Sequence, residues 1–333
     1  SYARLRMSSV GIVLGGGGVT GASYEMAALM ALELATGWDP ARADVIVGTS
    51  GGAYVSALVR SGRLDLDSMV QHHEDRRAVA ERISGHLFSR DRSVRLGRWM
   101  RHGLLPGLRR PGLTMLLGGP AAWSTDGLAE WVRHQCGPVA DSWPALPTII
   151  TAFDVATKRR VAFGTEAAPD VTLSEAVAAS SAIPVLFQPR AIGDRLYVDG
   201  GVVSGTHADL VLGNPDQLDL LIVIAPMAAE EDREGAWFYE KVFDRVGRTA
   251  LGSELTRIHE EWPETDVVVL RPSPAVLSVM RPNPLDPAAA VPTFIRALMA
   301  MRRKLADPEI WTVLDRHLVG ESRHRHRLRR ARA

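Results

Sequence analysis

The first part of the chain alternates short apolar runs with helical patterns. Residues 10–14 are an apolar run ending at four glycines, and residues 22–36 carry apolar side chains at helical spacing before the stop signal Gly37. A second apolar run at residues 44–47 leads through the turn GTSGG into an apolar helix at residues 53–60. Buried strands that alternate with helices predict a parallel sheet covered by helices, which is an α/β fold.

The second half of the chain continues this pattern. Two strands joined by the polar turn DVATKR predict a hairpin, and another strand enters a DGG turn. The expected strands are at residues 147–153, 160–163, 195–198, 219–225 and 266–270, and the expected helices at residues 173–180, 235–261 and 288–305.

The pattern breaks between residues 63 and 143. A charged helix is followed by a stretch that mixes Leu, Met and Trp with Arg and with paired Gly and Pro, without a clean period. We interpret this segment as a helical insertion over the edge of the sheet. Two interpretations remain open: a lid over the site, or an ordinary helical subdomain whose arginines extend their charged ends to water.

Composition narrows the class of protein. The 333 residues are 46% hydrophobic, which allows a sizeable core, and the net charge of +1 gives no overall field that would attract nucleic acid. Cys136 is the single cysteine, so no intrachain disulfide can form. No apolar run is long enough to span a membrane, and we expect a cytoplasmic protein, although a signal removed before Ser1 stays open.

The last residues, 316–333, form a basic tail that we expect to be disordered. Two other interpretations stay open, peripheral contact with an anionic membrane and non-specific binding of nucleic acid. The charges for such contacts are Arg323, Arg325, Arg327, Arg329, Arg330 and Arg332.

The strongest chemical signal is GTSGG, a G-x-S-x-G motif formed by Gly48, Ser50 and Gly52 between a strand and a helix. In this context the turn is so tight that side chains at the two glycines would collide with backbone. The serine hydroxyl would project into a cleft beside a helix N-terminus, which favours negative charge near the attacking oxygen. We therefore predict that Ser50 is a nucleophile.

A serine hydroxyl needs a base, and two residues are candidates. His207 is the best placed of the ten histidines, but a structural role suits it better. Asp199 ends a strand and is followed by Gly200 and Gly201, so its carboxylate can reach across the sheet edge. It can act as a base if it is partly desolvated beside Ser50.

The glycine loop admits two chemistries. Gly16, Gly18 and Gly21 fit G-x-G-x-x-G, which can hold a dinucleotide pyrophosphate or can direct backbone N–H groups at the oxyanion of an ester. A dinucleotide site also needs an acid that closes the second strand, about twenty residues beyond the loop. Asp39 and Asp44 precede that strand, which disfavours a dinucleotide-binding oxidoreductase.

The three motifs in this order resemble the patatin-like phospholipases, lipid acyl hydrolases with a Ser-Asp dyad. The segments TAFDVATKRRVAF and AVAASSAIPVLFQPRAIGDRLYVDGGV are also similar to the family. The resemblance covers residues 10–212 and implies a three-layer α/β/α catalytic core with a mainly parallel sheet. Residues 213–315 are then expected to complete the same α/β domain.

By this resemblance, Ser50 is the nucleophile, Asp199 the general base, and Gly16, Gly17 and Gly18 form the oxyanion hole. The implied activity is cleavage of fatty-acyl ester bonds in lipids, with no cofactor and no metal. One departure is Thr20, which stands where the family usually has Arg or Lys. It leaves open a neutral ester as substrate, or a catalytically weak protein that binds lipid or regulates a partner.

Overall fold

The computed structural model describes residues 8–64, 75–90, 121–229, 238–280 and 283–319. The basic tail from residue 320 onward and the middle of the insertion lie outside these ranges, so the expectations for them remain predictions.

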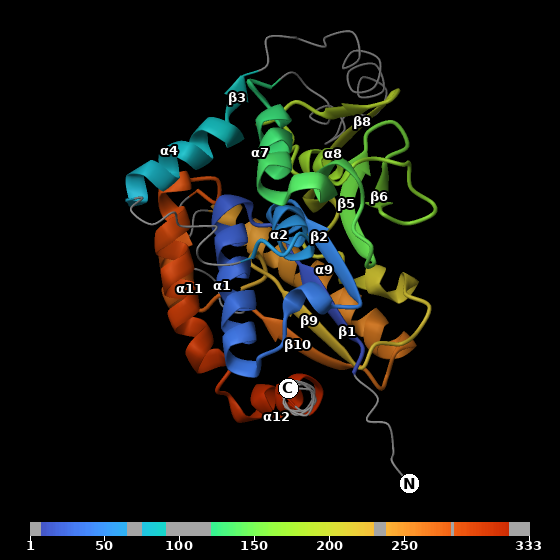
Figure 1. Ribbon diagram of the computed structural model, residues 1–333, viewed down its shortest axis with the longest axis vertical. Coiled ribbons are helices and arrows are strands. Elements are labelled where there is room, and N and C mark those ends of the chain that lie inside the picture. Colours follow the sequence, from blue (N-terminus) through green and yellow to red (C-terminus); the bar gives the residue numbers. More distant parts are fainter. Residues whose placement is uncertain (1–7, 65–74, 91–120, 230–237, 281–282, 320–333) are drawn as a thin grey trace, which may run out of the picture.

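The strands and helices follow each other in the order that the apolar pattern predicts for most of the chain (Figure 1). The strands are β1 (Val10–Leu14), β2 (Val45–Thr49), β3 (Ser89–Arg90), β4 (Trp123–Ser124), β5 (Thr148–Asp154), β6 (Arg159–Phe163), β7 (Arg190–Ile192), β8 (Arg195–Asp199), β9 (Leu220–Ile224) and β10 (Asp266–Leu270). The helices are α1 (Gly18–Thr36), α2 (Gly51–Arg60), α4 (Arg76–Leu87), α7 (Asp126–Cys136), α8 (Leu173–Ser180), α9 (Phe238–Glu261), α10 (Pro274–Met280), α11 (Ala290–Lys304) and α12 (Pro308–Leu314).

Eight of the strands form one mixed sheet. Strands β10, β9, β1, β2 and β5 run parallel in that order, while β6 and β8 pair antiparallel with β5, and β7 pairs antiparallel with β8. The strands of residues 213–315 therefore extend the same sheet as the N-terminal strands. The short pair β3 and β4 forms a separate two-stranded sheet.

Helices cover both faces of the sheet, so the fold has three layers, α/β/α. Along β1, Ile12 and Leu14 pack into the core beneath α1 and α11, whereas Val13 packs into the core on the other face with Leu251 and Ile258 of α9. Figure 1 shows α1 and α11 side by side on one face and α9 behind the other. Central parallel strands are buried on both faces, which is why their sequences are continuously apolar.

Several boundaries match the sequence pattern. Strand β1, helix α8 and strand β10 have the predicted bounds, and Gly37 ends α1 with a left-handed φ of 69°. Helix α1 begins at Gly18, four residues before its predicted start, because the glycine loop forms its first turn. At the other end, a helical turn continues to Val319, into the segment assigned to the tail.

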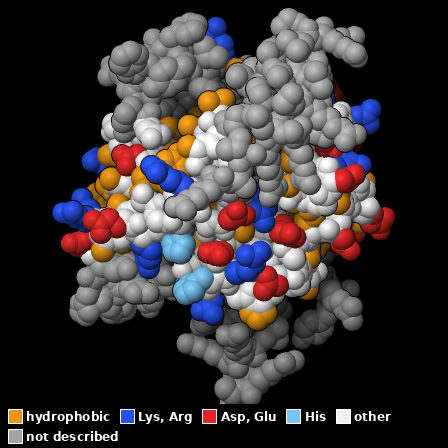
Figure 2. All heavy atoms as spheres, turned by 90° about the horizontal axis from the view of Figure 1, so that it is seen from above, with side chains coloured by type: hydrophobic (Ala, Val, Ile, Leu, Met, Phe, Trp, Pro, Cys, Tyr) orange, Lys and Arg blue, Asp and Glu red, His pale blue; other side chains and the backbone are white. Residues whose placement is uncertain are grey.

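The described parts of the insertion lie over one end of the sheet. Helices α4 and α7 contact each other there, and α7 also contacts α2 and α8. On the face seen from this end, described apolar, basic and acidic side chains are intermixed (Figure 2). Among the described residues, no helix combines the length and apolar character needed to cross a membrane.

Candidate active site

Ser50 occupies a strained turn between β2 and α2. Its φ of 52° and ψ of −117° lie in a region that the Cβ atom of a non-glycine residue disfavours. The Ser50 backbone N–H donates a 2.8 Å hydrogen bond to the Ser180 hydroxyl at the end of α8. Such strain persists only where surrounding contacts fix the backbone, so the turn holds the Ser50 hydroxyl in a defined position.

The two flanking glycines allow this tight turn. A Cβ atom at Gly48 would lie 2.7 Å from the Gly52 carbonyl oxygen, and one at Gly52 would lie 2.8 Å from the Gly15 carbonyl oxygen. Both distances are below any real Cβ contact. The predicted collision at these two positions is therefore confirmed.

Strand β5 brings Asp199 to Ser50. On one edge of β5, β2 ends with Thr49 opposite Thr151, and the antiparallel β8 ends with Asp199 opposite Ala152, while β6 pairs along the other edge. Strands β2 and β8 thus approach each other end to end along one edge of β5. This register places the last residue of β8 next to the residue that follows β2.

The Ser50 side chain interacts with the Asp199 carboxylate and favours its charged form. The carboxylate also accepts a 2.7 Å hydrogen bond from the Gly201 backbone N–H. Burial raises the pKa of Asp199 to about 6, although the interactions with Ser50 and Gly201 favour the charged form. Asp199 is therefore a stronger base than an exposed aspartate and is still ionised at neutral pH.

The end of α8 and the residues that directly follow it fix both Ser50 and Asp199. Ser180 accepts the hydrogen bond from the Ser50 N–H, and the Ala182 carbonyl oxygen accepts a 3.0 Å hydrogen bond from the Asp199 N–H. We did not single out Ser180 from the sequence. The helix end SSA could have indicated it, because a buried hydroxyl needs a hydrogen-bond partner.

The glycine loop lies against Ser50, but not all of its N–H groups are free. The Gly16 N–H donates a 2.6 Å hydrogen bond to the Gly205 carbonyl oxygen, so, unlike its neighbours in the loop, it is not free to donate to an oxyanion in this structure. In the described part of the chain, the N–H groups of Gly17, Gly18 and Gly51 have no hydrogen-bond partner. We did not single out the Gly51 N–H from the sequence; it is free because it lies at the start of α2, where N–H groups lack partners within the helix.

Thr20 and His207 are both buried, and their hydrogen bonds indicate structural roles. The Thr20 N–H donates to the Pro284 carbonyl oxygen, and its side chain is fully buried. The His207 Nε2–H donates to the Gly200 carbonyl oxygen at 3.0 Å, and Nδ1 accepts from Arg160. Burial lowers the pKa of His207 to about 4, so the ring is neutral and does not contact Ser50 as a base would.

The residues around His207 also include candidate ligands for a cation. The ligand atoms of His207, Asp209 and Glu254 lie within 4.8 Å of one another. The Arg160 guanidinium already binds both carboxylate oxygens of Asp209, at 2.7 and 2.9 Å, and bonds to His207 Nδ1. A positive charge thus stands beside these ligand atoms, which opposes binding of a metal ion there.

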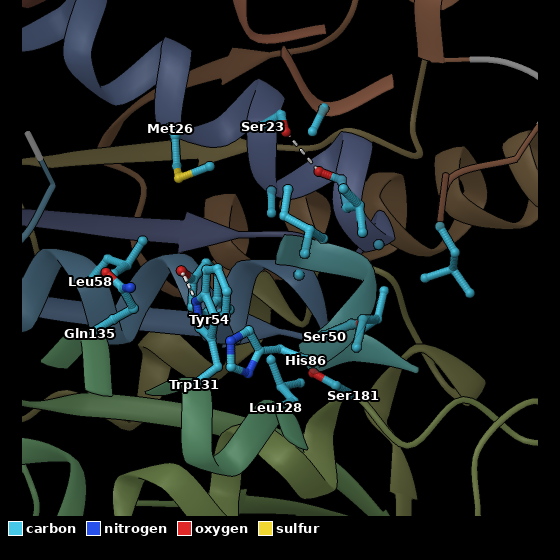
Figure 3. A pocket seen from close by; sticks show the side chains of 18 of the residues that line it. Ser23, Met26, Ser50, Tyr54, Leu58, His86, Leu128, Trp131, Gln135 and Ser181 are labelled. Carbon is cyan, nitrogen blue, oxygen red and sulfur yellow. Dashed lines mark hydrogen bonds between the residues drawn. The ribbon is translucent and has the colours of Figure 1, made fainter. Parts of the chain in front are cut away.

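An apolar cavity of about 190 Å³ begins at Ser50 and at the starts of α1 and α2. In Figure 3, Ser50 and Ser181 lie on one side of it and Leu58 and Gln135 on the other, with Tyr54 and Trp131 between them. The Trp131 Nε1–H donates to the Tyr54 hydroxyl at 2.6 Å, which satisfies the indole N–H on this wall. Helix α4 also lines the cavity, with residues that include Val79, Ile83 and His86.

The family model of patatin-like phospholipases matches residues 12–212. No curated protein matches the chain.

Two solved structures are similar to this chain in fold. VipD from Legionella pneumophila is 14% identical with a TM-score of 0.39, and the match covers 93% of this chain and 67% of that chain. Human GIVD cytosolic phospholipase A2, solved in complex with methyl gamma-linolenyl fluorophosphonate, is 13% identical with a TM-score of 0.41. That match covers 93% of this chain and 60% of the human chain.

Proposed function

Because this chain belongs to the patatin-like phospholipase family, we propose that it is a serine hydrolase that cleaves fatty-acyl ester bonds of lipids with Ser50 and Asp199. The single observation that carries this proposal is the interaction of a buried carboxylate, Asp199, with the side chain of Ser50, which lines an apolar cavity. A nucleophile, a base and an acyl site are thereby brought together.

In the proposed mechanism, Asp199 takes the proton of Ser50 as the serine oxygen attacks the ester carbonyl carbon. The oxyanion that forms accepts hydrogen bonds from the N–H groups of Gly17, Gly18 and Gly51, at the positive ends of α1 and α2. The tetrahedral intermediate expels the alcohol, which takes the proton from Asp199, and an acyl-enzyme remains. Asp199 then takes a proton from water as the water oxygen attacks the acyl carbon, and a second tetrahedral intermediate forms. Its collapse breaks the bond to the Ser50 oxygen, which takes the proton back from Asp199, and the fatty acid is released.

The proposal can be tested by covalent labelling. An alkyl fluorophosphonate should phosphonylate the Ser50 oxygen with loss of fluoride, and peptide mass spectrometry should find the added group on this residue. Wild-type protein should be labelled and lose turnover of a p-nitrophenyl acyl ester at the same rate. An unlabelled protein that binds lipid without turnover would instead support a non-catalytic lipid-binding role.

The length of the cavity predicts which acyl chains are cleaved fastest. Ser50 and Leu58 are eight residues apart, and eight residues of helix span about 12 Å at roughly 1.5 Å each. Each C–C bond of about 1.5 Å advances a zigzag chain by somewhat less than its length, so roughly eight to ten carbons fit along this path. A dry cavity of about 150 Å³ can hold benzene. The cavity volume of about 190 Å³ is therefore consistent with an acyl chain at the short end of this range of lengths.

We therefore expect Leu58→Trp to move the optimum of kcat/KM by at least two carbons toward shorter chains, because the larger ring fills the far end of the cavity. A series of p-nitrophenyl esters from acetate to palmitate measures the shift. Leu34→Trp is the matched control, since Leu34 is 79% exposed on α1 and does not line the cavity. An unchanged optimum in Leu58→Trp would place the acyl chain elsewhere.

A further inference from the structure

The turn of residues 204–208, which we call the coupling turn, is held by a carboxylate of helix α9, which packs against the residues that follow the turn. Glu254 of α9 accepts hydrogen bonds from the Ser204 hydroxyl, from the Thr206 hydroxyl at 2.6 Å and from the Ala208 backbone N–H at 2.8 Å. Three donors from five consecutive residues converge on this one side chain, so Glu254 fixes the whole turn.

The coupling turn contacts both halves of the proposed catalytic machinery. The Gly205 carbonyl oxygen accepts the 2.6 Å hydrogen bond from Gly16, the residue before the free N–H groups of the glycine loop. On the other side, His207 Nε2–H donates to the carbonyl oxygen of Gly200, the residue after Asp199. A shift of the turn would therefore move the oxyanion donors and the base relative to Ser50.

The hydrogen-bond directions in the turn require an acceptor at position 254. The Ser204 hydroxyl oxygen accepts from the N–H groups of Thr206 and His207, at 3.2 and 3.3 Å, so its own proton is directed to Glu254. His207 has a left-handed φ of 54°, a conformation that a non-glycine residue adopts at a cost in energy. The contacts with Glu254 stabilise this conformation of the turn.

We propose that Glu254 is a positioning residue that, through the coupling turn, fixes the oxyanion loop and Asp199 relative to each other. This inference rests on the proposed function, because it assigns a task to the same catalytic groups. Glu254 does not line the cavity, so its effect should be on the chemical step rather than on substrate binding.

Glu254→Gln tests this inference, because a glutamine amide has one acceptor oxygen where the turn offers three donors. A displacement of about 1 Å in a catalytic group lowers the rate by on the order of 100-fold, so we expect kcat to fall about 10- to 100-fold. KM should stay within about twofold, and the acid limb of the kcat/KM–pH profile should move as Asp199 changes its surroundings. Glu260→Gln, an exposed change on the same helix, should leave all three quantities unchanged.

Two further variants keep the test informative if Glu254→Gln fails to fold. Thr206→Val keeps the side-chain shape but removes one donor to Glu254, and we expect a smaller loss of kcat with the same sign. His207→Gln can still donate a hydrogen bond to the Gly200 carbonyl oxygen, whereas His207→Leu cannot, so Gln should retain more kcat than Leu.

The inference would be overturned if folded Glu254→Gln had the kcat of the wild type. If Glu254→Gln does not fold, a wild-type kcat in Thr206→Val would overturn it. Equal kcat values in folded His207→Gln and His207→Leu would also overturn it. These results differ from failure of the proposed function itself. If the proposed function fails, Ser50→Ala keeps its turnover. If only the inference on Glu254 fails, turnover depends on Ser50 but not on the coupling turn.

Discussion

Ser50→Gly is expected to abolish ester hydrolysis and yet to give a more stable protein than Ser50→Ala. Loss of the nucleophile should lower kcat by roughly 10⁶-fold, the size seen when a catalytic serine is removed from another serine hydrolase. The backbone strain at Ser50 costs on the order of 1–3 kcal/mol for any residue with a Cβ atom. Glycine removes that strain and adds about 0.5–1 kcal/mol of unfolded-state entropy, so the net gain over alanine should be about 1 kcal/mol.

The comparison of Gly with Ala at position 50 isolates the strain, because both variants lack the hydroxyl. Urea unfolding followed by circular dichroism gives the two free energies of unfolding, and p-nitrophenyl ester turnover gives the activity. Ser61→Ala, at the opposite end of α2, is the matched control and should keep wild-type turnover. Turnover in Ser50→Ala would disprove the nucleophile, and equal stability of the Gly and Ala variants would disprove the strained turn.

Asp199→Asn is expected to lower kcat by roughly 10²–10⁴-fold, the range that a general base contributes. The amide can still accept from the Gly201 N–H and can donate to the Ser50 oxygen, so the geometry should be kept while the base is lost. Steady-state kinetics with a p-nitrophenyl ester measures the loss. Asp194→Asn, a change at an exposed residue between β7 and β8, is the control and should have no effect.

The raised pKa of Asp199 predicts opposite pH dependences of activity and stability. Because the base must be ionised, kcat/KM of the wild type should rise with pH through about 6 and then level off. The pKa of 3.8 in the unfolded chain is lower, so the folded state binds the proton more tightly. The stabilising contribution of protonated Asp199 is therefore present below about pH 4 and is lost as pH rises through about 6.

This loss of stability has a measurable size. A difference of about two pKa units corresponds to roughly 3 kcal/mol of unfolding free energy between pH 4 and pH 7. Asp199→Asn should lack this contribution. The free energy of unfolding of the variant minus that of the wild type should therefore be larger at pH 7 than at pH 4. A pH–activity profile without an acid limb near pH 6, or identical pH dependences of stability, would contradict the role of Asp199.

Ser50 and Asp199 would then both be costly to the folded protein, one through its backbone and the other through its buried charge. Strain and buried charge at catalytic positions are expected where activity requires them, because surrounding contacts hold each group in place. Here those contacts include Ser180, Ala182 and the coupling turn. We therefore expect lost turnover together with a gain in stability, for Ser50→Gly relative to Ser50→Ala and for Asp199→Asn relative to the wild type at neutral pH.

The sequence predicted the strand–turn–helix around Ser50 because that information is local. An apolar run, two glycines and a second apolar run specify a buried strand, a tight turn and a helix from neighbouring residues alone. The same holds for β8 and its DGG turn, which placed Asp199 at a strand end. The layered α/β fold followed from the repetition of such units.

Four features of the site required the tertiary structure. The Gly16 N–H is bound by Gly205, nearly two hundred residues later in the chain, which no local pattern indicates. Likewise, Glu254 lies within a long charged helix and reaches the coupling turn only because α9 packs there. The cavity wall formed by α4 and the raised pKa of Asp199 both result from the packing of several elements around the site.

By itself, the sequence determined which residue types stand at the strand ends and which turns present them, because backbone conformation there depends on near neighbours. The tertiary structure decided which of these groups meet, through the shared edge of β5, and which N–H groups stay free. The reason is physical: hydrogen-bond pairing and burial are properties of the packed molecule and depend on residues distant in the chain.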